Sequence, residues 1–324
     1  MNIGIIGCGL IGNKRAMVIG RHTIRWLVDS DLAKAETMSK SFPSAQSSDN
    51  WHSVIEDSKV DAVFVATSHK FLAPITLAAV EAGKHVLVEK PAAMNFNELE
   101  PIIEKAEDNG VCVKVGFNHR FHYAFIKAKE IVLDGALGPL MFICARYGHG
   151  ARIGYEKEWR AIPEISGGGE LIDQGMHLID LSRWFLGDFQ EVTGFTPTYY
   201  WDMPVDDNAF LMLKTANKKV AWLHASWTEW KNQFSFEIYG ENGKLHIDGL
   251  GGSYGVERLT WYKMLPQMGP PETTTWEYPF PDRSWELEFE EFFSAITQKR
   301  VPSGNLYDAK AALEIVHKVY GGSK

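Results

Sequence analysis

A chain of 324 residues is long enough for two domains, and its content of 45% hydrophobic and 23% charged residues is that of an ordinary globular protein. The formal net charge of -8 argues against general binding to nucleic acid, which needs a basic surface. Three cysteines without a repeated spacing fit a reducing compartment and no disulfide framework. The first residues lack a basic region, and their apolar run is too short for export or for spanning a membrane, so we expect a cytoplasmic protein without a membrane partner.

The first predicted strand, Ile3 to Ile6, leads into a glycine-rich turn that opens a predicted helix ending near Ile19. The turn reads G-x-G-x-x-G, a pattern that is weak alone but typical of dinucleotide binding between a strand and a helix. Gly7 permits the tight turn, Gly9 lets the backbone approach a pyrophosphate, and Gly12 lets the helix pack closely on the strand. The pyrophosphate then meets free amides at the start of the helix. The predicted cofactor contacts of this loop are Gly7, Gly9, Leu10, Ile11 and Gly12.

A second predicted strand, at residues 24–28, ends in Asp29. A carboxylate at this place accepts hydrogen bonds from the adenosine ribose, and it repels a 2′-phosphate. Ser30 and Asp31 supply no arginine to neutralise such a phosphate, and the nearest base is Lys34. We therefore expect NAD in preference to NADP. The alternative is a structural turn with an unrelated aspartate.

Strands and helices continue to alternate up to residue 115. The predicted elements are helices at 31–42, 51–57, 73–82 and 95–108, and strands at 60–66, 86–88 and 111–115. This alternation predicts an α/β half with a doubly wound parallel sheet. The strand at 60–66 ends in Thr67 and Ser68, and the strand at 86–88 ends in Glu89-Lys90-Pro91.

Lys90 is the first candidate for catalysis. Open parallel sheets bind ligands outside the carboxyl ends of their strands, so a lysine at that end lies beside the ligand. The alternative is that Lys90 merely caps a strand and that Pro91 begins the next loop.

The pattern changes after residue 121, where strands follow one another with few helices between them. We expect a helix at 124–133, a strand at 140–147, a helix from the triple glycine at 167–169 to 185, strands at 192–199, 208–214, 220–227, 234–239, 244–248 and 257–262, and closing helices at 285–298 and 305–320. Phe234, Phe236 and Ile238 alternate with polar residues, which is the period of a sheet with one buried face. Asn242-Gly243 predicts a hairpin turn. The prediction is a domain at 1–120 and an α+β domain at 121–324 with a mainly antiparallel open sheet.

Asp173 and His177 are the second group of catalytic candidates. They are four residues apart in a predicted helix, so they share a face, and Asp180 lies near the same side. An aspartate can orient an imidazole and stabilise its charged form, as general acid–base catalysis requires. A lone histidine here is otherwise an ordinary core residue. A metal site would need third and fourth ligands that the spacing does not offer, so we predict no metal.

The stretch from Tyr147 to Ile165 is the candidate for substrate recognition. Aromatic faces stack on sugar rings, and arginines bind carboxylates or phosphates in pairs of hydrogen bonds. This composition favours an anionic or nucleotide-linked sugar, and the alternative is a solvated loop anchored by a tryptophan. The predicted substrate contacts here are Arg152, Tyr155, Trp159 and Arg160.

The glycine loop, Glu89-Lys90-Pro91 and the Gly167 to His177 segment occur in an order that resembles the glucose–fructose oxidoreductase / inositol dehydrogenase (Gfo/Idh/MocA) family, nearly end to end. The resemblance implies an N-terminal Rossmann domain and an NAD(P)-dependent oxidoreductase acting on sugars, polyols or nucleotide-linked sugars. It also implies a cis peptide between Lys90 and Pro91. It implies cofactor contacts at Thr67, Ser68, Glu89, Lys90 and Asn118, and substrate contacts at Lys90, Arg120, Asp173 and His177. The loop after Thr67 departs from the family's usual Thr-Pro-Asn-x-x-His, because Ser68, His69 and Leu72 replace its proline, asparagine and histidine.

The expected chemistry follows from these residues. His177 would accept the hydroxyl proton of a secondary alcohol as hydride leaves for the cofactor, since an unperturbed imidazole has a pKa of about 6.5. Lys90 would stabilise the developing alkoxide, and in reverse it would polarise a ketone. Alternatives are the same fold acting on a non-sugar diol or an imine, and a non-enzymatic regulator that senses a dinucleotide.

We also expect the protein to form a homo-oligomer, a dimer or a tetramer. A sheet with one covered face must be covered on the other or expose an apolar patch. The residues in or beside these strands that suggest such a patch are Trp222, Trp227, Trp230 and Trp261.

Overall fold

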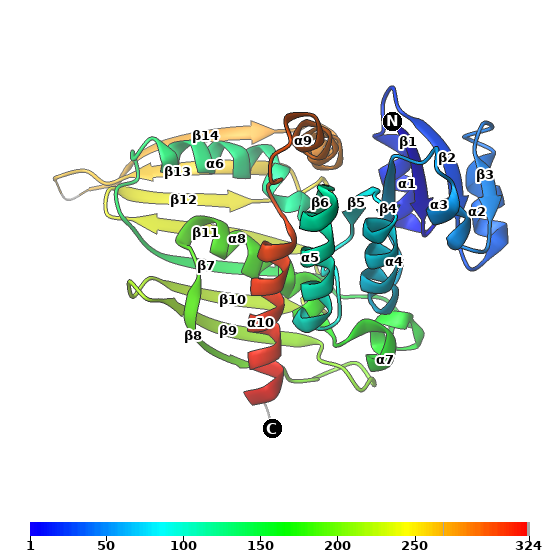
Figure 1. Ribbon diagram of the computed structural model, residues 1–324. Helices are drawn as coiled ribbons and strands as arrows, with labels where there is room; N and C mark the ends of the chain where they lie inside the picture. Colours follow the sequence, from blue (N-terminus) through cyan, green and yellow to red (C-terminus); the bar gives the residue numbers. More distant parts are fainter. Residues whose placement is uncertain (268, 323–324) are drawn as a thin grey trace. The chain divides into compact units, whose positions relative to one another are not determined.

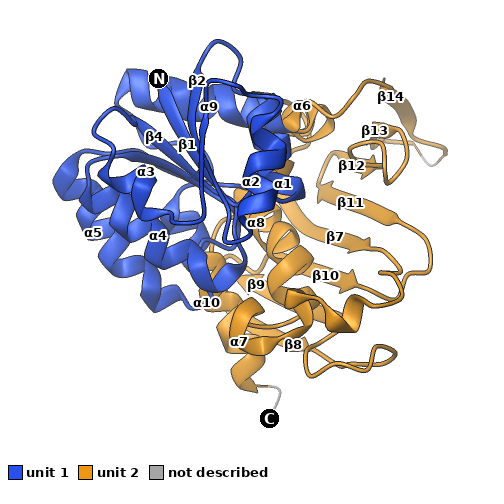
Figure 2. Ribbon diagram, turned by 90° about the vertical axis from the view of Figure 1, so that its right-hand side faces the viewer, with its two compact units in different colours: residues 1–117, 285–310 blue, residues 118–284, 311–324 orange. Residues whose placement is uncertain are grey.

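The computed structural model describes residues 1–267 and 269–322, which divide into two compact units. Unit 1 comprises residues 1–117 and 285–310, and unit 2 comprises residues 118–284 and the C-terminal residues from 311 (Figure 2). Unit 1 therefore contains a helix that follows the whole of the second sheet in the chain. Among the described residues, no helix is both long and apolar enough to cross a membrane.

Unit 1 contains a parallel six-stranded sheet in the order β3-β2-β1-β4-β5-β6. Its strands are β1 (Asn2–Ile6), β2 (Thr23–Val28), β3 (Gln46–Ser48), β4 (Ala62–Val65), β5 (His85–Val88) and β6 (Val113–Val115) (Figure 1). The helices of this part of the chain are α1 (Leu10–Met17), α2 (Leu32–Ser39), α3 (His52–Glu56), α4 (His69–Glu81), α5 (Glu100–Asn109) and α9 (Ser284–Gln298). The strand order reverses between β1 and β4, and this confirms the predicted doubly wound sheet.

The core of unit 1 explains why α9 belongs there. Strands β1, β4 and β5 are almost wholly buried, as expected for a parallel sheet covered on both faces. Phe289 and Phe292 of α9 pack in the same core cluster as Ile5 and Phe64. The ring centroids of Phe64 and Phe289 lie 5.9 Å apart in an edge-to-face arrangement.

Unit 2 contains an eight-stranded sheet in the order β14-β13-β12-β11-β7-β10-β9-β8 (Figure 1). Its strands are β7 (Leu140–Gly148), β8 (Phe189–Phe195), β9 (Asn208–Thr215), β10 (Val220–Ser226), β11 (Gln233–Gly240), β12 (Gly243–Asp248), β13 (Glu257–Lys263) and β14 (Glu272–Tyr278). Only β7 and β10 pair in parallel among these strands, so the predicted mainly antiparallel sheet is confirmed. The helices here include α6 (Tyr123–Leu133), α7 (Pro163–Ser166) and α8 (Met176–Leu186), and α10 (Leu306–Gly322) belongs to unit 2 from residue 311 onward.

Helices α6 and α8 cover one face of the second sheet. Phe234 and Phe236 of β11 are buried, and both rings contact Phe125 of α6. Phe236 also contacts Phe185 of α8. The predicted alternation along this strand is therefore confirmed, since its apolar residues face the helices.

Strands β3 and β14 were not predicted, and β8 begins three residues earlier than expected. Both missing strands lie at sheet edges. β3 reads Gln-Ser-Ser, and β14 has no buried residue. Edge strands of this kind lack the apolar pattern by which buried strands are recognised.

Candidate active site

The glycine loop of unit 1 has room for glycine alone at two of its positions. Gly7 has a φ of +100°, and a Cβ there would lie 2.3 Å from the Ala66 carbonyl oxygen. A Cβ at Gly12 would lie 1.8 Å from the Gly7 carbonyl oxygen. At Gly9, by contrast, an added Cβ would meet nothing within 4 Å. The loop thus combines a forced tight turn with an open backbone at the N-cap of α1, which fits the approach of a pyrophosphate.

Asp29 lies at the carboxyl end of β2 and contacts the glycine loop. Its Oδ2 accepts a hydrogen bond of 2.8 Å from the Cys8 amide, and its Oδ1 accepts one of 3.0 Å from the Asp31 amide. Burial, and then the Asp29 charge, raise the pKa of the Cys8 thiol to about 12. Hydrogen bonds from backbone amides therefore join the Asp29 carboxylate to the glycine loop at Cys8. Leu10 and Ile11 begin α1, and Ser68 precedes α4 as its N-cap, with the Thr67 hydroxyl donating to the Ser68 carbonyl.

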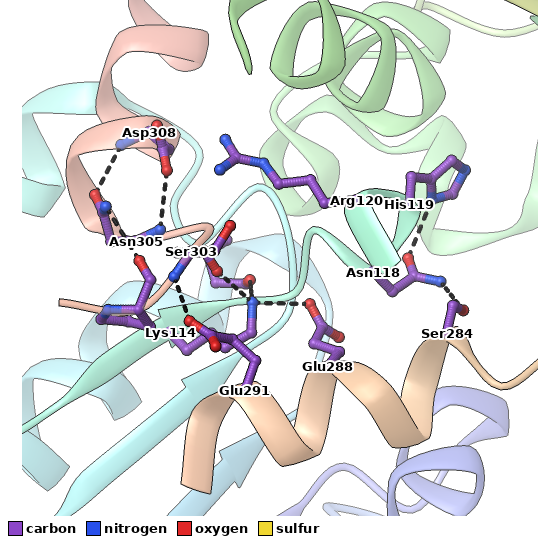
Figure 3. A network of polar contacts seen from close by, with 12 residues as sticks. Lys114, Asn118, His119, Arg120, Ser284, Glu288, Glu291, Ser303, Asn305 and Asp308 are labelled. Atoms are coloured by element: carbon purple, nitrogen blue, oxygen red, sulfur yellow. Dashed lines mark hydrogen bonds and ion pairs between the residues drawn. The ribbon is translucent and has the colours of Figure 1, made fainter. Parts of the chain in front are cut away.

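Glu89 belongs to a buried charge cluster that we define as Arg15, Glu89, Lys114 and Glu288. Arg15 Nε donates to Glu89 Oε1 at 2.8 Å, and its Nη1 lies 2.5 Å from Glu288 Oε2. Lys114 Nζ lies 3.2 Å from Glu288 Oε1 (Figure 3). Burial raises the pKa of Glu89, and the Arg15 charge opposes this shift. Two cations and two carboxylates balance one another inside unit 1, next to Lys90.

The segment after β5 is packed closely. The Lys90–Pro91 peptide bond is cis, as the family resemblance implies. Pro91 is buried, and Lys90 is partly exposed. Gly116, just beyond β6, would bring a Cβ within 2.8 Å of Glu89 Oε2, so the strand end also requires a small residue. Contacts within unit 1 thereby hold the backbone that carries Lys90.

Unit 2 positions Asp173 and His177 through the triple glycine. The buried carboxylate of Asp206 accepts hydrogen bonds from the amides of Gly169 (2.9 Å) and Leu171 (2.8 Å). Tyr320 near the C-terminus donates its hydroxyl to the same carboxylate at 2.8 Å. A Cβ at Gly169 would lie 1.9 Å from the Asp206 carbonyl oxygen, which explains the glycine. Sequence reasoning missed Asp206 and Tyr320, although the Asp-Asp pair directly before a strand was a usable signal.

Asp173 lies in a π-helical turn, Leu171–Gly175, that continues into α8. In the predicted helix, residues four apart share one face, as they do in an uninterrupted α-helix. A π turn closes hydrogen bonds over five residues and is common at functional sites. Asp173 and His177 are both buried on this helix.

His177 stacks on a second histidine that sequence reasoning did not select. The His119 and His177 ring centroids are 3.7 Å apart with an interplanar angle of 20°. The ring nitrogen Nδ1 of His119 is 3.1 Å from Asn118 Oδ1, and Asn118 Nδ2 donates to Ser284 Oγ at 3.0 Å (Figure 3). A sequence signal existed in Asn118-His119-Arg120, but only its first and last residues were chosen.

Arg120 makes a buried ion pair with Asp180 of α8. Its Nε donates to Asp180 Oδ2 at 2.8 Å, and its Nη2 lies 2.5 Å from Oδ1. This paired geometry ties the 3₁₀ turn Asn118–Phe121 to the helix that carries His177. The substrate role predicted for Arg120 stays a prediction.

The predicted recognition loop is anchored to Asp173. Arg160 Nε donates to Asp173 Oδ2 at 3.1 Å, and the Arg160 guanidinium lies over the Trp159 ring. Arg152 pairs with Glu158. Tyr155 is buried, with its ring 4.8 Å from that of Trp227.

Among residues 1–267 and 269–322, no group of three or more His, Cys, Asp or Glu side chains is arranged to hold a metal ion.

Two family models match the chain. Residues 1–117 match "Oxidoreductase family, NAD-binding Rossmann fold", and residues 125–246 match "GFO/IDH/MocA C-terminal domain". Similar proteins include levoglucosan dehydrogenase of Pseudarthrobacter phenanthrenivorans, 26% identical over 76% of this chain and 73% of its own length. Another is D-glucoside 3-dehydrogenase of Escherichia coli, 27% identical over 70% of each chain.

Solved structures show the same fold. Levoglucosan dehydrogenase in complex with NADH and levoglucosan has a TM-score of 0.89 at 24% identity, covering 100% of this chain and 97% of that one. GenD2 from gentamicin A biosynthesis, in complex with NAD, has a TM-score of 0.85 at 22% identity, covering 100% and 94%. These similarities extend over both units.

Proposed function

The chain belongs to the GFO/IDH/MocA family of oxidoreductases with an NAD-binding Rossmann fold, and from this premise we propose that it oxidises a secondary alcohol of a sugar or polyol with NAD, or reduces the corresponding ketone. Its relatives include dehydrogenases named for levoglucosan, inositol and D-glucosides. The observation that carries the proposal is the buried pair Asp173 and His177, held on one helix behind a triple glycine.

In the proposed reaction, NAD supplies a hydride acceptor when bound, and the chain supplies the proton chemistry and the binding. His177 accepts the hydroxyl proton through its imidazole, and Asp173 stabilises the charged ring. Lys90 donates a hydrogen bond to the reacting oxygen and stabilises its negative charge. The amides of the glycine loop bind the pyrophosphate, and Asp29 accepts hydrogen bonds from the ribose.

The test is a spectrophotometric assay of NADH formation on a panel of monosaccharides, polyols, glycosides and non-sugar diols, together with an assay of NADH consumption on a panel of imines. We expect turnover on a ring sugar or polyol. Turnover only on a diol or imine would overturn the assigned substrate class. NADH binding without turnover on any compound would instead support a dinucleotide-sensing regulator.

The NAD preference is tested by titrating the protein with NADH and NADPH. We expect tighter binding of NADH, because Asp29 follows β2 and is bonded to the Cys8 amide of the glycine loop, and a carboxylate at that place would repel a 2′-phosphate. The Asp29→Ala variant should reduce the difference between the dissociation constants for NADH and NADPH. Equal or tighter binding of NADPH by the unmodified protein would refute this assignment.

Self-association through the open face of the second sheet is a further part of the proposal. Met212 and Trp222 are paired across β9 and β10, and both are exposed. Trp222 also pairs with Cys144 of β7, so apolar side chains continue across three strands. Trp227, which the sequence suggested for this patch, is fully buried in the core. Light scattering should show a dimer or tetramer, and a species of 36.5 kDa at micromolar concentration would contradict it.

The cytoplasmic location stays a prediction, which cell fractionation tests.

A further inference from the structure

Unit 2 exposes three aromatic side chains on two neighbouring loops. We define the aromatic platform as Tyr199 (71% exposed), Tyr200 (62%) and Trp230 (63%). The first two lie between β8 and β9, and Trp230 lies between β10 and β11. The Tyr200 and Trp230 rings are 4.6 Å apart at an angle of 81°. Aromatic rings gathered at the surface in this way indicate a binding surface, since scattered exposure would need no explanation.

A fully buried carboxylate holds the tyrosine side of the platform. Asp207 Oδ1 accepts from the Tyr199 amide at 2.9 Å, and Oδ2 accepts from the amides of Tyr200 (2.8 Å) and Trp201 (3.1 Å). The Trp201 indole in turn donates to the Trp227 carbonyl at 3.1 Å. Three successive amides on one carboxylate fix the backbone, so the rings are presented without a large further loss of conformational entropy.

Trp230 is presented at an energetic cost to the backbone. Its φ is +55°, in the left-handed region that a bulky residue rarely adopts. Its Cα would lie 3.2 Å from a Cβ at Gly150, so the indole-bearing loop packs directly on the start of the recognition loop. Strained residues of this kind are concentrated at binding sites.

The recognition loop connects the platform to the predicted acid–base residues within unit 2. The Glu229 amide, next to Trp230, donates to the His149 carbonyl at 3.3 Å. Burial lowers the pKa of His149, and the nearby Asp173 carboxylate opposes this shift. Arg160, at the other end of the loop, donates to Asp173. One loop of unit 2 therefore contacts both the platform, at Gly150, and Asp173, through Arg160.

The charges of this region favour a neutral ligand. Arg146 makes hydrogen bonds of 2.9 and 3.0 Å to both carboxylate oxygens of Glu229. Arg152 pairs with Glu158, and Arg160 pairs with Asp173. A phosphate would have to displace one of these carboxylates, so the arginines do not favour the anionic or nucleotide-linked sugar suggested by the sequence.

We propose that the aromatic platform binds the second ring of a neutral glycoside, that is, the sugar or aglycone joined to the ring that Asp173 and His177 address. The inference rests on the proposed function for the identity of the first ring. Stacking of the second ring on Tyr200 and Trp230 buries apolar ring faces and adds affinity that a monosaccharide cannot use. The substrate class would then be glycosides in preference to free sugars.

The test compares glucose, cellobiose, 4-nitrophenyl glucoside and uridine-diphosphate glucose as probes. Binding is measured by saturation-transfer NMR and calorimetry, without NAD, so this arm does not depend on turnover. We expect one of the two neutral glycosides to bind ~10-fold more tightly than glucose, which a stacking energy near 1.4 kcal/mol would give. Trp230→Gly should remove most of that difference, and glycine suits the left-handed backbone, so the variant should stay folded.

Phe280→Ala is the matched control, because Phe280 is an equally exposed aromatic residue of unit 2 outside the platform. It should leave the ratio of glycoside to glucose binding unchanged. Equal binding of glucose and both neutral glycosides would overturn the inference. Tighter binding of uridine-diphosphate glucose than of either neutral glycoside would also overturn it. A change of oligomeric mass in Trp230→Gly would overturn it too, because the platform would then be a contact between copies of the chain. Failure of the proposed function would appear differently, as absent NAD-dependent turnover on every sugar while the binding comparison stands.

Discussion

Replacing Glu288 with methionine should destabilise unit 1 by about 3–5 kcal/mol, the usual effect of breaking a buried ion pair. The Glu288 carboxylate is fully buried and contacts two cations, Arg15 at 2.5 Å and Lys114 at 3.2 Å. Without it, the buried charge cluster holds two cations against the single carboxylate of Glu89. The uncompensated charge would be desolvated in the folded state and hydrated in the unfolded state.

The assay is urea unfolding, with hydrogen exchange of peptides from β1 and β6 to assign the change to unit 1. Glu100→Gln is the matched control, because Glu100 pairs with Lys310 at 2.9 Å on the surface of the same unit with its side chain 55% exposed. An exposed pair of this kind contributes about 0–1 kcal/mol. The control should therefore barely move the unfolding midpoint.

A double variant tests the reasoning more sharply. Lys114→Met combined with Glu288→Met removes one charge of each sign and leaves Arg15 paired with Glu89. It should be more stable than Glu288→Met alone, although the Ser303 carbonyl loses its 2.7 Å hydrogen bond from Lys114. The reasoning is refuted if Glu288→Met behaves like the surface control, or if the effects of the two single variants simply add.

Three further outcomes are expected. His177→Ala should lower turnover by about 10²–10⁴-fold and abolish the acidic limb of the pH–rate profile, and Lys90→Ala should lower turnover by about 10²–10³-fold. Both variants should keep nearly the same affinity for NADH in a fluorescence titration. Near-normal turnover of His177→Ala would show that another residue is the base. The Trp26 indole donates a hydrogen bond to Asp57, and with further hydrogen bonds and an ion pair it outweighs partial burial and lowers the pKa of Asp57 to about 2. The stabilisation from this carboxylate is therefore present above its unfolded-state pKa and is lost as the pH falls towards 2. The free energy of unfolding, measured across acid pH, should fall less steeply in Asp57→Asn than in the unmodified protein. Because burial raises the pKa of the Cys8 thiol to about 12, iodoacetamide at pH 8 should not label it in the folded protein and should label it in urea, as mass spectrometry would show.

Local pattern was enough to predict those features in which neighbours in the chain act together. The glycine loop, the buried strands around it and the alternation along β11 are each specified within a few residues. The hairpin between β11 and β12 was also predicted, although its turn lies at Glu241-Asn242, with Gly243 opening the next strand at a φ of +148°. In each case steric rules and the period of side-chain burial operate over short distances along the chain.

The partners of the site residues were decided by tertiary structure. Arg15 and Glu288 are 273 positions apart, yet they form one ion pair in the core of unit 1. His119 was passed over although both of its neighbours in the chain were chosen, because its stacking on the distant His177 ring depends on packing that the local motif does not specify. The arginines of the recognition loop read as anion binders, and folding pairs them with carboxylates. Periodicity reports which face of an element is buried, whereas the identity of the group opposite depends on packing between distant segments, where the desolvation of each charge must be offset by a partner of opposite sign.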